Sequence, residues 1–234
     1  MKSLSGAGTF RRKPQMPVQG VSGEYIMKIV CFGDSNTYGF DPRLGSTGRY
    51  DKNERWTGIL DGLDGFSVLN EGMNGRCIPN TDAGFASLEH ALDRNPDADV
   101  FMILLGTNDL FMVRGITAQG ISDRMRRAFQ NVPALREFTR KKGKHTLIVS
   151  PARSSDQVLF YAMAGIPTGQ TKESAACILR ELPGELEKCA REFGALFADA
   201  GEWDIPLSYD GIHFSEEGHR RFAKHMADVL RGLS

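Results

Sequence analysis

The sequence predicts a single α/β domain built around a parallel sheet. Two features point to this class. Short apolar runs alternate with longer segments of helical pattern, and the apolar runs end in glycine or polar residues. The composition agrees, because 234 residues with 41% hydrophobic and 25% charged side chains can form one substantial core.

Five apolar runs are expected to form the strands. The first, Met27–Phe32, precedes a polar loop that contains several glycines, and the run from Asp99 to Leu105 has the composition of a second central strand. The remaining strands are shorter, and His145 is expected to open one of them. The expected strands are residues 27–32, 66–70, 99–105, 145–150 and 195–198.

Five helices are expected between and after these strands. In the fourth, the pair Pro183-Gly184 predicts a kink or a split, and the last has Ser215 as its expected N-cap. The basic residues between Arg124 and Lys142 are interpreted as one solvated face of the third helix. The expected helices lie near residues 55–63, 82–93, 117–140, 172–193 and 215–231.

Residues 1–26 differ from the rest of the chain. Their basic residues outnumber the single acid Glu24, and they show no hydrophobic periodicity. No apolar segment follows the positive charges, so a secretory signal is not expected. We interpret residues 1–26 as a disordered extension, or as a segment from an upstream start codon or from cloning, and residues 27–234 as the domain.

The net charge bears on the partners of the protein, and the spacing of the cysteines bears on the redox state of their thiols. The formal net charge is zero, so there is no electrostatic case for nucleic acid or for a membrane surface. The cysteines lack Cys-x-x-Cys spacing and are expected to be reduced thiols of a cytoplasmic protein. They are Cys31, Cys77, Cys177 and Cys189.

Four polar segments lie at the ends of expected strands or at the start of a helix. Because carboxyl ends of parallel strands share one edge of the sheet, these segments are expected to meet there. Together they supply a serine, an asparagine, a loop of small residues and an Asp-x-x-His pair, which are the parts of an acyl-transfer site. The segments are Gly33–Asn36, Asn70–Arg76, Gly106–Asp109 and Asp210–His213.

Less specific interpretations exist for each segment. Gly33–Asn36 is in isolation an ordinary turn, Asn108-Asp109 suits a helix cap, and Asp210-Gly211 suits a surface turn. A metal site is a further alternative, because histidines recur every six residues at 213, 219 and 225. On a helix that step turns the side chain by ~600°, so successive histidines point ~120° apart and do not form one ligand face. His219 and His225 are therefore interpreted as surface or hydrogen-bonded helix residues, and no metal is expected.

The segments in this order resemble the SGNH hydrolases, also called GDSL-type esterases and lipases. Shorter matches, among them Arg55–Gly58 and Val149–Pro151, resemble the arylesterase/acyltransferase branch of that family. The resemblance implies a three-layer α/β/α fold, with a five-stranded parallel sheet in flavodoxin-like order and helices on both faces. The Gly-x-Ser-x-Gly elbow of the α/β-hydrolases is absent because Thr37 occupies its last position.

Carried over residue by residue, the resemblance makes Ser35 the nucleophile, His213 the general base and acid, and Asp210 the residue that orients the imidazole. The oxyanion hole would consist of the backbone amides of Ser35 and Gly75 and the side-chain amide of Asn108, with Gly72 as an alternative to Gly75. Asn36 departs from the family pattern, in which leucine is commoner after the serine.

Residues beside these segments are expected to shape the substrate pocket. They are Tyr38, Phe40, Asn74, Phe111 and Ile212, and the alternative for the aromatic residues is that they only close the core. The long connection from Pro151 to Lys172 is interpreted as either a lid or an oligomer contact.

The sequence therefore predicts a cytoplasmic serine esterase that needs no cofactor. Its expected substrates are small esters, short-acyl or aryl, with acyl transfer to alcohols or peroxide as a further activity and a homo-oligomer as the expected assembly. Deacetylation of a carbohydrate and a thioesterase role are alternatives on the same fold. A non-catalytic binding module of the SGNH fold is the alternative from a different class.

Overall fold

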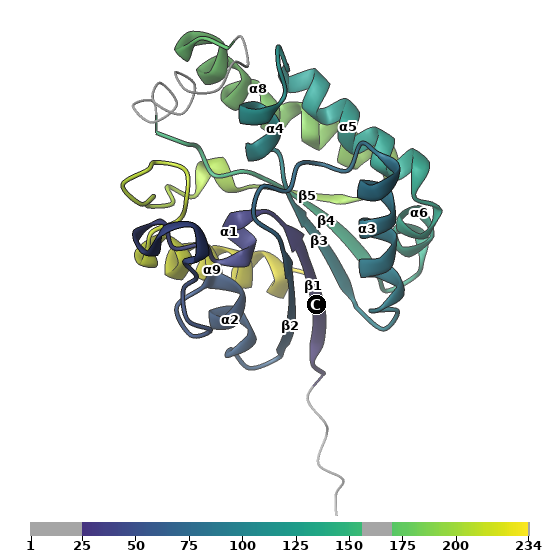
Figure 1. Ribbon diagram of the computed structural model, residues 1–234. Coiled ribbons are helices and arrows are strands. Elements are labelled where there is room, and N and C mark those ends of the chain that lie inside the picture. Colours follow the sequence, from purple (N-terminus) through teal and green to yellow (C-terminus); the bar gives the residue numbers. More distant parts are fainter. Residues whose placement is uncertain (1–24, 156–169, 234) are drawn as a thin grey trace, which may run out of the picture.

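The computed structural model describes residues 25–155 and 170–233. These residues form a five-stranded parallel sheet with helices on both faces (Figure 1). The strand order β2-β1-β3-β4-β5 is the flavodoxin-like order, which confirms the expected fold. The strands are β1 (Met27–Gly33), β2 (Phe66–Gly72), β3 (Val100–Leu104), β4 (His145–Ser150) and β5 (Leu196–Asp199).

Two hydrophobic cores lie against the sheet, one on each face. Successive side chains of a strand point to opposite faces. In β1, Val30 and Phe32 pack with α3, α5, α6 and α8, whereas Ile29 and Cys31 pack with α2 and α9. Because both faces are covered, β1 and β3 are apolar nearly throughout, as is typical of central parallel strands.

Four of the main helices, α2, α3, α8 and α9, match expected ones in position, and α5 and α6 lie where one helix was expected. These helices are α2 (Trp56–Asp61), α3 (Asp82–Asp93), α5 (Ala118–Asn131), α6 (Pro133–Arg140), α8 (Lys172–Phe193) and α9 (Glu216–Arg231). Ser215 is the N-cap of α9, and its side chain accepts a hydrogen bond from the Gly218 amide, as expected. Short helical turns follow some of the strands and loops: α1 (Ser35–Tyr38), η1 (Pro42–Thr47), α4 (Thr107–Met112) and η2 (Ala200–Glu202).

The expected helix over residues 117–140 is wrong, because the chain forms α5 and α6 with a break at Val132. A residue before proline is disfavoured in helical conformation. Val132 is accordingly extended, with φ −115° and ψ 90°, and Pro133 takes the first position of α6. The expected single solvated face is also wrong for Arg124, which makes an ion pair with the fully buried Asp109.

Of the two outcomes expected at Pro183, a kink or a split of the helix, the split is wrong. The helix α8 continues from Lys172 to Phe193 through that proline. Its buried side chains lie on both sides of Pro183, including Leu179, Leu182 and Leu186, and they pack into the core shared with α5. We attribute the continuity to this packing, which holds both halves against the same core and offsets the hydrogen bond lost at proline.

Two expectations fall mainly on residues outside the described ranges. These are the disordered extension over residues 1–26, of which only Tyr25 and Ile26 are described, and the lid or oligomer contact within residues 151–172. Tyr25 and Ile26 are exposed and lead into β1. In the described ranges, no helix has both the length and the apolar character that crossing a membrane requires.

Candidate active site

The candidate site lies at the carboxyl edge of the sheet, where the strand order changes direction. The chain runs from β1 to β2 on one side and returns to β3 on the other, so the loops after β1 and β3 diverge around a crevice. Ser35 follows β1 and Asn108 follows β3. The topology therefore places these two predicted site residues beside the switch point (Figure 1).

A chain of hydrogen bonds connects Ser35, His213 and Asp210. The His213 Nε2 atom lies 2.9 Å from Ser35 Oγ, and His213 Nδ1 lies 2.5 Å from Asp210 Oδ2. An ionised carboxylate only accepts hydrogen bonds, so Nδ1 carries the proton in the neutral ring and Nε2 accepts from the serine hydroxyl. This tautomer leaves His213 ready to receive the Ser35 proton.

The segment 210–213 is a tight turn built around the Asp210 carboxylate. Asp210 Oδ1 accepts hydrogen bonds from the backbone amides of Ile212 and His213, each at 3.0 Å. Burial alone would raise the pKa of Asp210, but the hydrogen bonds from the His213 ring and these amides hold that pKa below its usual value. The carboxylate therefore stays charged and can stabilise an imidazolium at His213.

Ser35 lies in a rigid turn that begins at Asp34. The Asp34 side chain caps α1 by accepting a hydrogen bond from the Asn36 amide at 2.9 Å. Asp34 is 2% exposed, and this burial raises its pKa to about 6. Only 7% of Ser35 is exposed, so the expected nucleophile is held in a fixed direction at the end of β1.

The backbone amides of Ser35 and Gly75 donate to no acceptor among the residues that the structure describes. The Gly72 amide, by contrast, donates to Asn70 Oδ1 at 2.9 Å. A Cβ on Gly72 would lie 2.2 Å from the Tyr38 nitrogen, so glycine is required there for close approach of β2 and α1. The structure thus favours Gly75 over Gly72 as a candidate oxyanion donor.

The turn that carries Gly75 is fastened to the start of α4. Asn108 Nδ2 donates to the Arg76 carbonyl at 3.1 Å, which leaves its second N–H for another acceptor. Asp109 Oδ2 accepts from the Ile78 amide at 2.9 Å, and its Oδ1 accepts from Arg124 at 3.0 Å. Asn108 and Asp109 therefore lie within α4 and hold the 76–78 segment, rather than only capping a helix.

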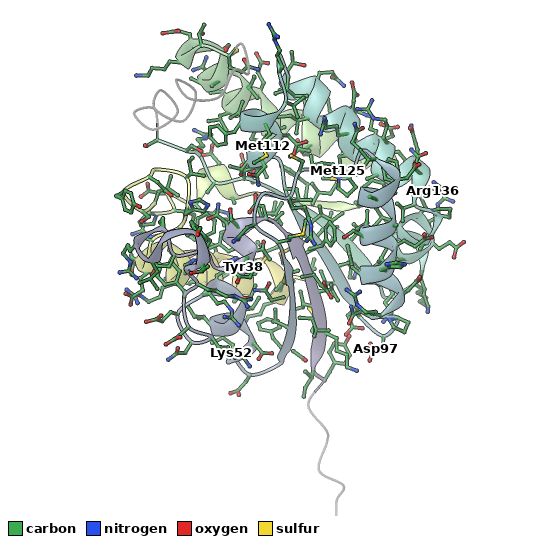
Figure 2. The ribbon with its side chains drawn as sticks, viewed as in Figure 1. Tyr38, Lys52, Asp97, Met112, Met125 and Arg136 are labelled. Atoms are coloured by element: carbon green, nitrogen blue, oxygen red, sulfur yellow. The ribbon has the colours of Figure 1, made fainter. Side chains whose placement is uncertain are left out.

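The expected pocket residues have different surroundings. Phe40 packs against the His213 ring, with 4.6 Å between the ring centroids. Tyr38, at the end of α1 (Figure 2), lies under the Arg49 guanidinium, whose Cζ is 4.0 Å from the ring centroid. Phe111 is 5% exposed and belongs to the core shared with α5, so the alternative that it closes the core holds for this residue. Ile212 also packs against that core, and Asn74 is exposed.

A cavity of about 390 Å³ has Gly75 among its lining residues. Its volume is in the range of small-molecule sites. Its lining residues come from the Met73–Thr81 segment, the first turns of α3, and two inner side chains, Phe32 and Arg124. The expected pocket residues are not among those that line it. The exposed Met112 at the end of α4 reaches this rim, because a Cβ on Gly75 would lie 3.8 Å from Met112 Cε (Figure 2).

The three regularly spaced histidines lie in different surroundings. His213 belongs to the hydrogen-bonded chain, and His225 stacks on Trp203. The interpretation of His219 as a surface or hydrogen-bonded residue is wrong in part. His219 is fully buried, its Nδ1 accepts from the Trp56 amide at 3.3 Å, and its Nε2 has no partner in the described ranges. The sequence signal for a core position was its i+3, i+4 and i+7 spacing to Phe222, Ala223 and Met226, which are buried on the same helix.

The sequence profile of the GDSL-like lipase/acylhydrolase family matches residues 31–221. This span includes every residue of the hydrogen-bonded chain and all of the candidate oxyanion donors. The comparison with curated protein sequences found no match.

Solved structures give the second comparison. Est24, a carbohydrate acetylesterase from Sinorhizobium meliloti, superposes with a TM-score of 0.70 at 26% identity. A native aryl esterase from M. smegmatis superposes with a TM-score of 0.68 at 27% identity. In both cases the match covers 89% of this chain and 100% of the other.

Proposed function

This chain belongs to the GDSL-like lipase/acylhydrolase family and is an ester hydrolase, and we propose that it cleaves small esters through an acyl-enzyme on Ser35. The observation that carries the proposal is the chain of hydrogen bonds from Asp210 through His213 to Ser35 Oγ. A serine hydroxyl becomes an effective nucleophile when a neighbouring base takes its proton during attack.

In the proposed first half-reaction, Ser35 Oγ attacks the ester carbonyl carbon and His213 Nε2 takes the hydroxyl proton. The ionised Asp210 stabilises the imidazolium that forms. The amides of Ser35 and Gly75 and the free N–H of Asn108 would donate to the carbonyl oxygen as it becomes an anion. His213 then gives its proton to the leaving alkoxide, and the acyl group stays on Ser35.

In the second half-reaction, a water molecule replaces the alcohol and loses a proton to His213 as it attacks the acyl carbonyl. Ser35 regains its proton and the carboxylic acid leaves. Small aryl and short-acyl esters are the proposed substrates, because similar chains of known structure include an aryl esterase and a carbohydrate acetylesterase.

The Ser35→Ala variant tests this proposal. It should fold normally and lose nearly all hydrolysis of p-nitrophenyl acetate, because a methyl group cannot form the acyl-enzyme. A serine-directed phosphonate should add to Ser35, as measured by peptide mass spectrometry. Ser67→Ala is a matched control on β2, whose side chain lies far from the carboxyl edge. Wild-type turnover by Ser35→Ala, or labelling of another serine, would refute the assignment.

Deacetylation of carbohydrates is a second candidate, favoured by the 26% identity to Est24 over nearly the whole chain. Acetate release from peracetylated xylose, measured beside release from phenyl acetate, separates the two substrate classes. Hydrolysis of the aryl ester alone would exclude the carbohydrate.

Acyl transfer stays a prediction. Phe40 covers one part of the His213 ring with an apolar surface, which would disfavour water relative to a small alcohol. Addition of a short primary alcohol should then divert part of the product from acid to ester, as measured by mass spectrometry. Free acid at every alcohol concentration would leave a plain hydrolase.

A cytoplasmic location and self-association are likewise untested predictions, to be checked by cell fractionation and by size-exclusion chromatography with light scattering.

A further inference from the structure

The side chain of Asn36 binds the backbone on both sides of His213. Its Nδ2 donates to the Ile212 carbonyl at 3.2 Å, and its Oδ1 accepts from the Phe214 amide at 2.9 Å. These two contacts lie directly before and after His213, so the Asn36 side chain holds the backbone of the histidine from both sides.

The chemistry of these two contacts requires a primary amide. A carboxamide offers a donor and an acceptor side by side, whereas a carboxylate offers only acceptors and leucine offers neither. A leucine at this position would leave the Phe214 amide and the Ile212 carbonyl without these partners.

Asn36 is itself buried and held by hydrogen bonds of its own backbone. It is 6% exposed, its backbone amide donates to Asp34 Oδ1, and its carbonyl accepts from Trp56 Nε1 at 2.9 Å. Asn36 directly follows Ser35 in the chain. Its side chain therefore connects the backbone around His213 to the backbone of the serine.

The turn that carries His213 is held to other segments at Gly211, whose carbonyl accepts from the Ser155 amide at 3.1 Å, and at Tyr209, whose hydroxyl donates to the Pro42 carbonyl at 2.9 Å. The Asn36 contacts differ from these because they lie directly on either side of His213. Asp210 and His213 bind each other within one turn, so their mutual geometry does not depend on Ser35. The Phe40 ring contacts the imidazole, but an apolar contact has little directionality. The remaining requirement is the 2.9 Å separation between His213 Nε2 and Ser35 Oγ.

We propose that Asn36 is a positioning residue, which places the preformed Asp210–His213 pair within proton-transfer distance of Ser35. The inference rests on the proposed function, since it concerns the same reaction. A misplacement of about 1 Å in such a site can cost on the order of 100-fold in rate. Asn36→Leu should accordingly lower kcat by about 10- to 100-fold with little change in KM.

The experiment compares Asn36→Leu with Thr146→Val. Thr146 is buried at the opposite end of the sheet, where its hydroxyl is bonded to Thr139 Oγ1 at 2.8 Å, so the control also loses a buried hydrogen bond. For each protein, Tm, kcat, KM and the rate of Ser35 inactivation by a phosphonate are measured across pH. Asn36→Leu should lose kcat and inactivation rate by the same factor, while the midpoint of the acid limb stays in place because the Asp210–His213 pair is intact. Thr146→Val should have a lower Tm and the kcat, KM and inactivation rate of the wild type.

The result that would overturn the proposal is Asn36→Leu with the kcat and inactivation rate of Thr146→Val. If Asn36→Leu does not fold, Asn36→Asp takes its place, because it keeps the volume and the acceptor for Phe214 and loses the donor. Its kcat on the alkaline plateau should lie below that of the wild type, and equality would refute the inference. Ser35→Ala separates the two levels: if that variant keeps its activity, the proposed function fails, whereas an inactive Ser35→Ala with a fully active Asn36→Leu refutes only the positioning role.

Discussion

At the scale of single residues, the candidate site is a set of unpaired donors around one hydroxyl group. Ser35 and Gly75 each present a backbone N–H without an acceptor in the described part of the chain, and Asn108 uses one of its two side-chain N–H groups to bind the Arg76 carbonyl. Unpaired donors beside a nucleophile suit a charge that exists only during the reaction. Asn108 is the one member of this set whose donor a substitution can remove.

Asn108→Ala should lower kcat by roughly 100- to 1,000-fold with little change in KM, because its donor would matter most once the carbonyl oxygen is an anion. Steady-state kinetics with p-nitrophenyl acetate measure both constants. Asn131→Ala is the matched control, since Asn131 also donates one side-chain hydrogen bond to a carbonyl, on exposed α5 surface. A raised KM with kcat unchanged would instead make Asn108 a substrate contact.

At the scale of elements, the loop that carries Gly75 depends on a buried ion pair between α4 and α5. Asp109 is fully buried and joins the Ile78 amide to the Arg124 guanidinium. Burial raises the pKa of Asp109, although the Ile78 amide and Arg124 act against that rise. A buried carboxylate that loses its cation is costly, so this pair links the stability of two helices to the shape of the site.

Arg124→Met should lower the free energy of unfolding by about 3 kcal/mol, because it leaves the Asp109 charge without its cation. Urea unfolding measures the change. Arg127→Met on the same helix is the control, since Arg127 is exposed and its contact with Asn80 is at the surface. Equal stability of the two variants would show that Asp109 is not charged in the folded protein. A fall in kcat for Arg124→Met is also expected, through the 76–78 segment.

At the scale of the whole molecule, two buried polar groups near the site, His219 and Asp34, have pKa values that folding shifts in opposite directions. Burial and the nearby Arg55 charge lower the pKa of His219 to about 3, whereas burial raises that of Asp34 to about 6. Between about pH 6.5 and pH 3 the unfolded chain holds a proton on His219 that the folded chain lacks, so folding becomes less favourable as pH falls. Asp34 acts oppositely between about pH 6 and pH 4, because the folded chain then holds the extra proton.

His219→Gln should therefore flatten the loss of stability at acid pH, by up to about 1.4 kcal/mol per pH unit. Glutamine has no charge and keeps an acceptor for the Trp56 amide. Urea unfolding between pH 4.5 and pH 7 measures the slope, and Asp34 contributes equally to both proteins. His90→Gln, at an exposed position on α3, is the control for replacing a histidine with glutamine. Identical slopes for the wild type and His219→Gln would show that folding does not lower the pKa of His219.

The positions of the strands and the residue types of the candidate site could be predicted from the sequence alone. Periodicity and composition are local properties, so the five strands and the start of α9 at Ser215 lie within a residue or two of their expected places. The carboxyl edge followed as well, because parallel strands place the residues after β1 and β3 at one edge whatever fills the core. The break at Val132 also has a local signal in the sequence, the proline that follows it. The prediction of one continuous helix did not take this signal into account.

The pairing of the buried polar groups could not be predicted from the sequence, because it depends on the tertiary fold. Asn36 is separated by 176 residues from the Ile212 carbonyl that it binds and by 178 from the Phe214 amide. Arg124 turned inward to Asp109, α8 ran through Pro183, and His219 was buried with one ring nitrogen unpaired in the described part of the chain. In each case the outcome depends on segments far apart in the chain, because a buried group takes the partner or the packing that the assembled layers bring to it.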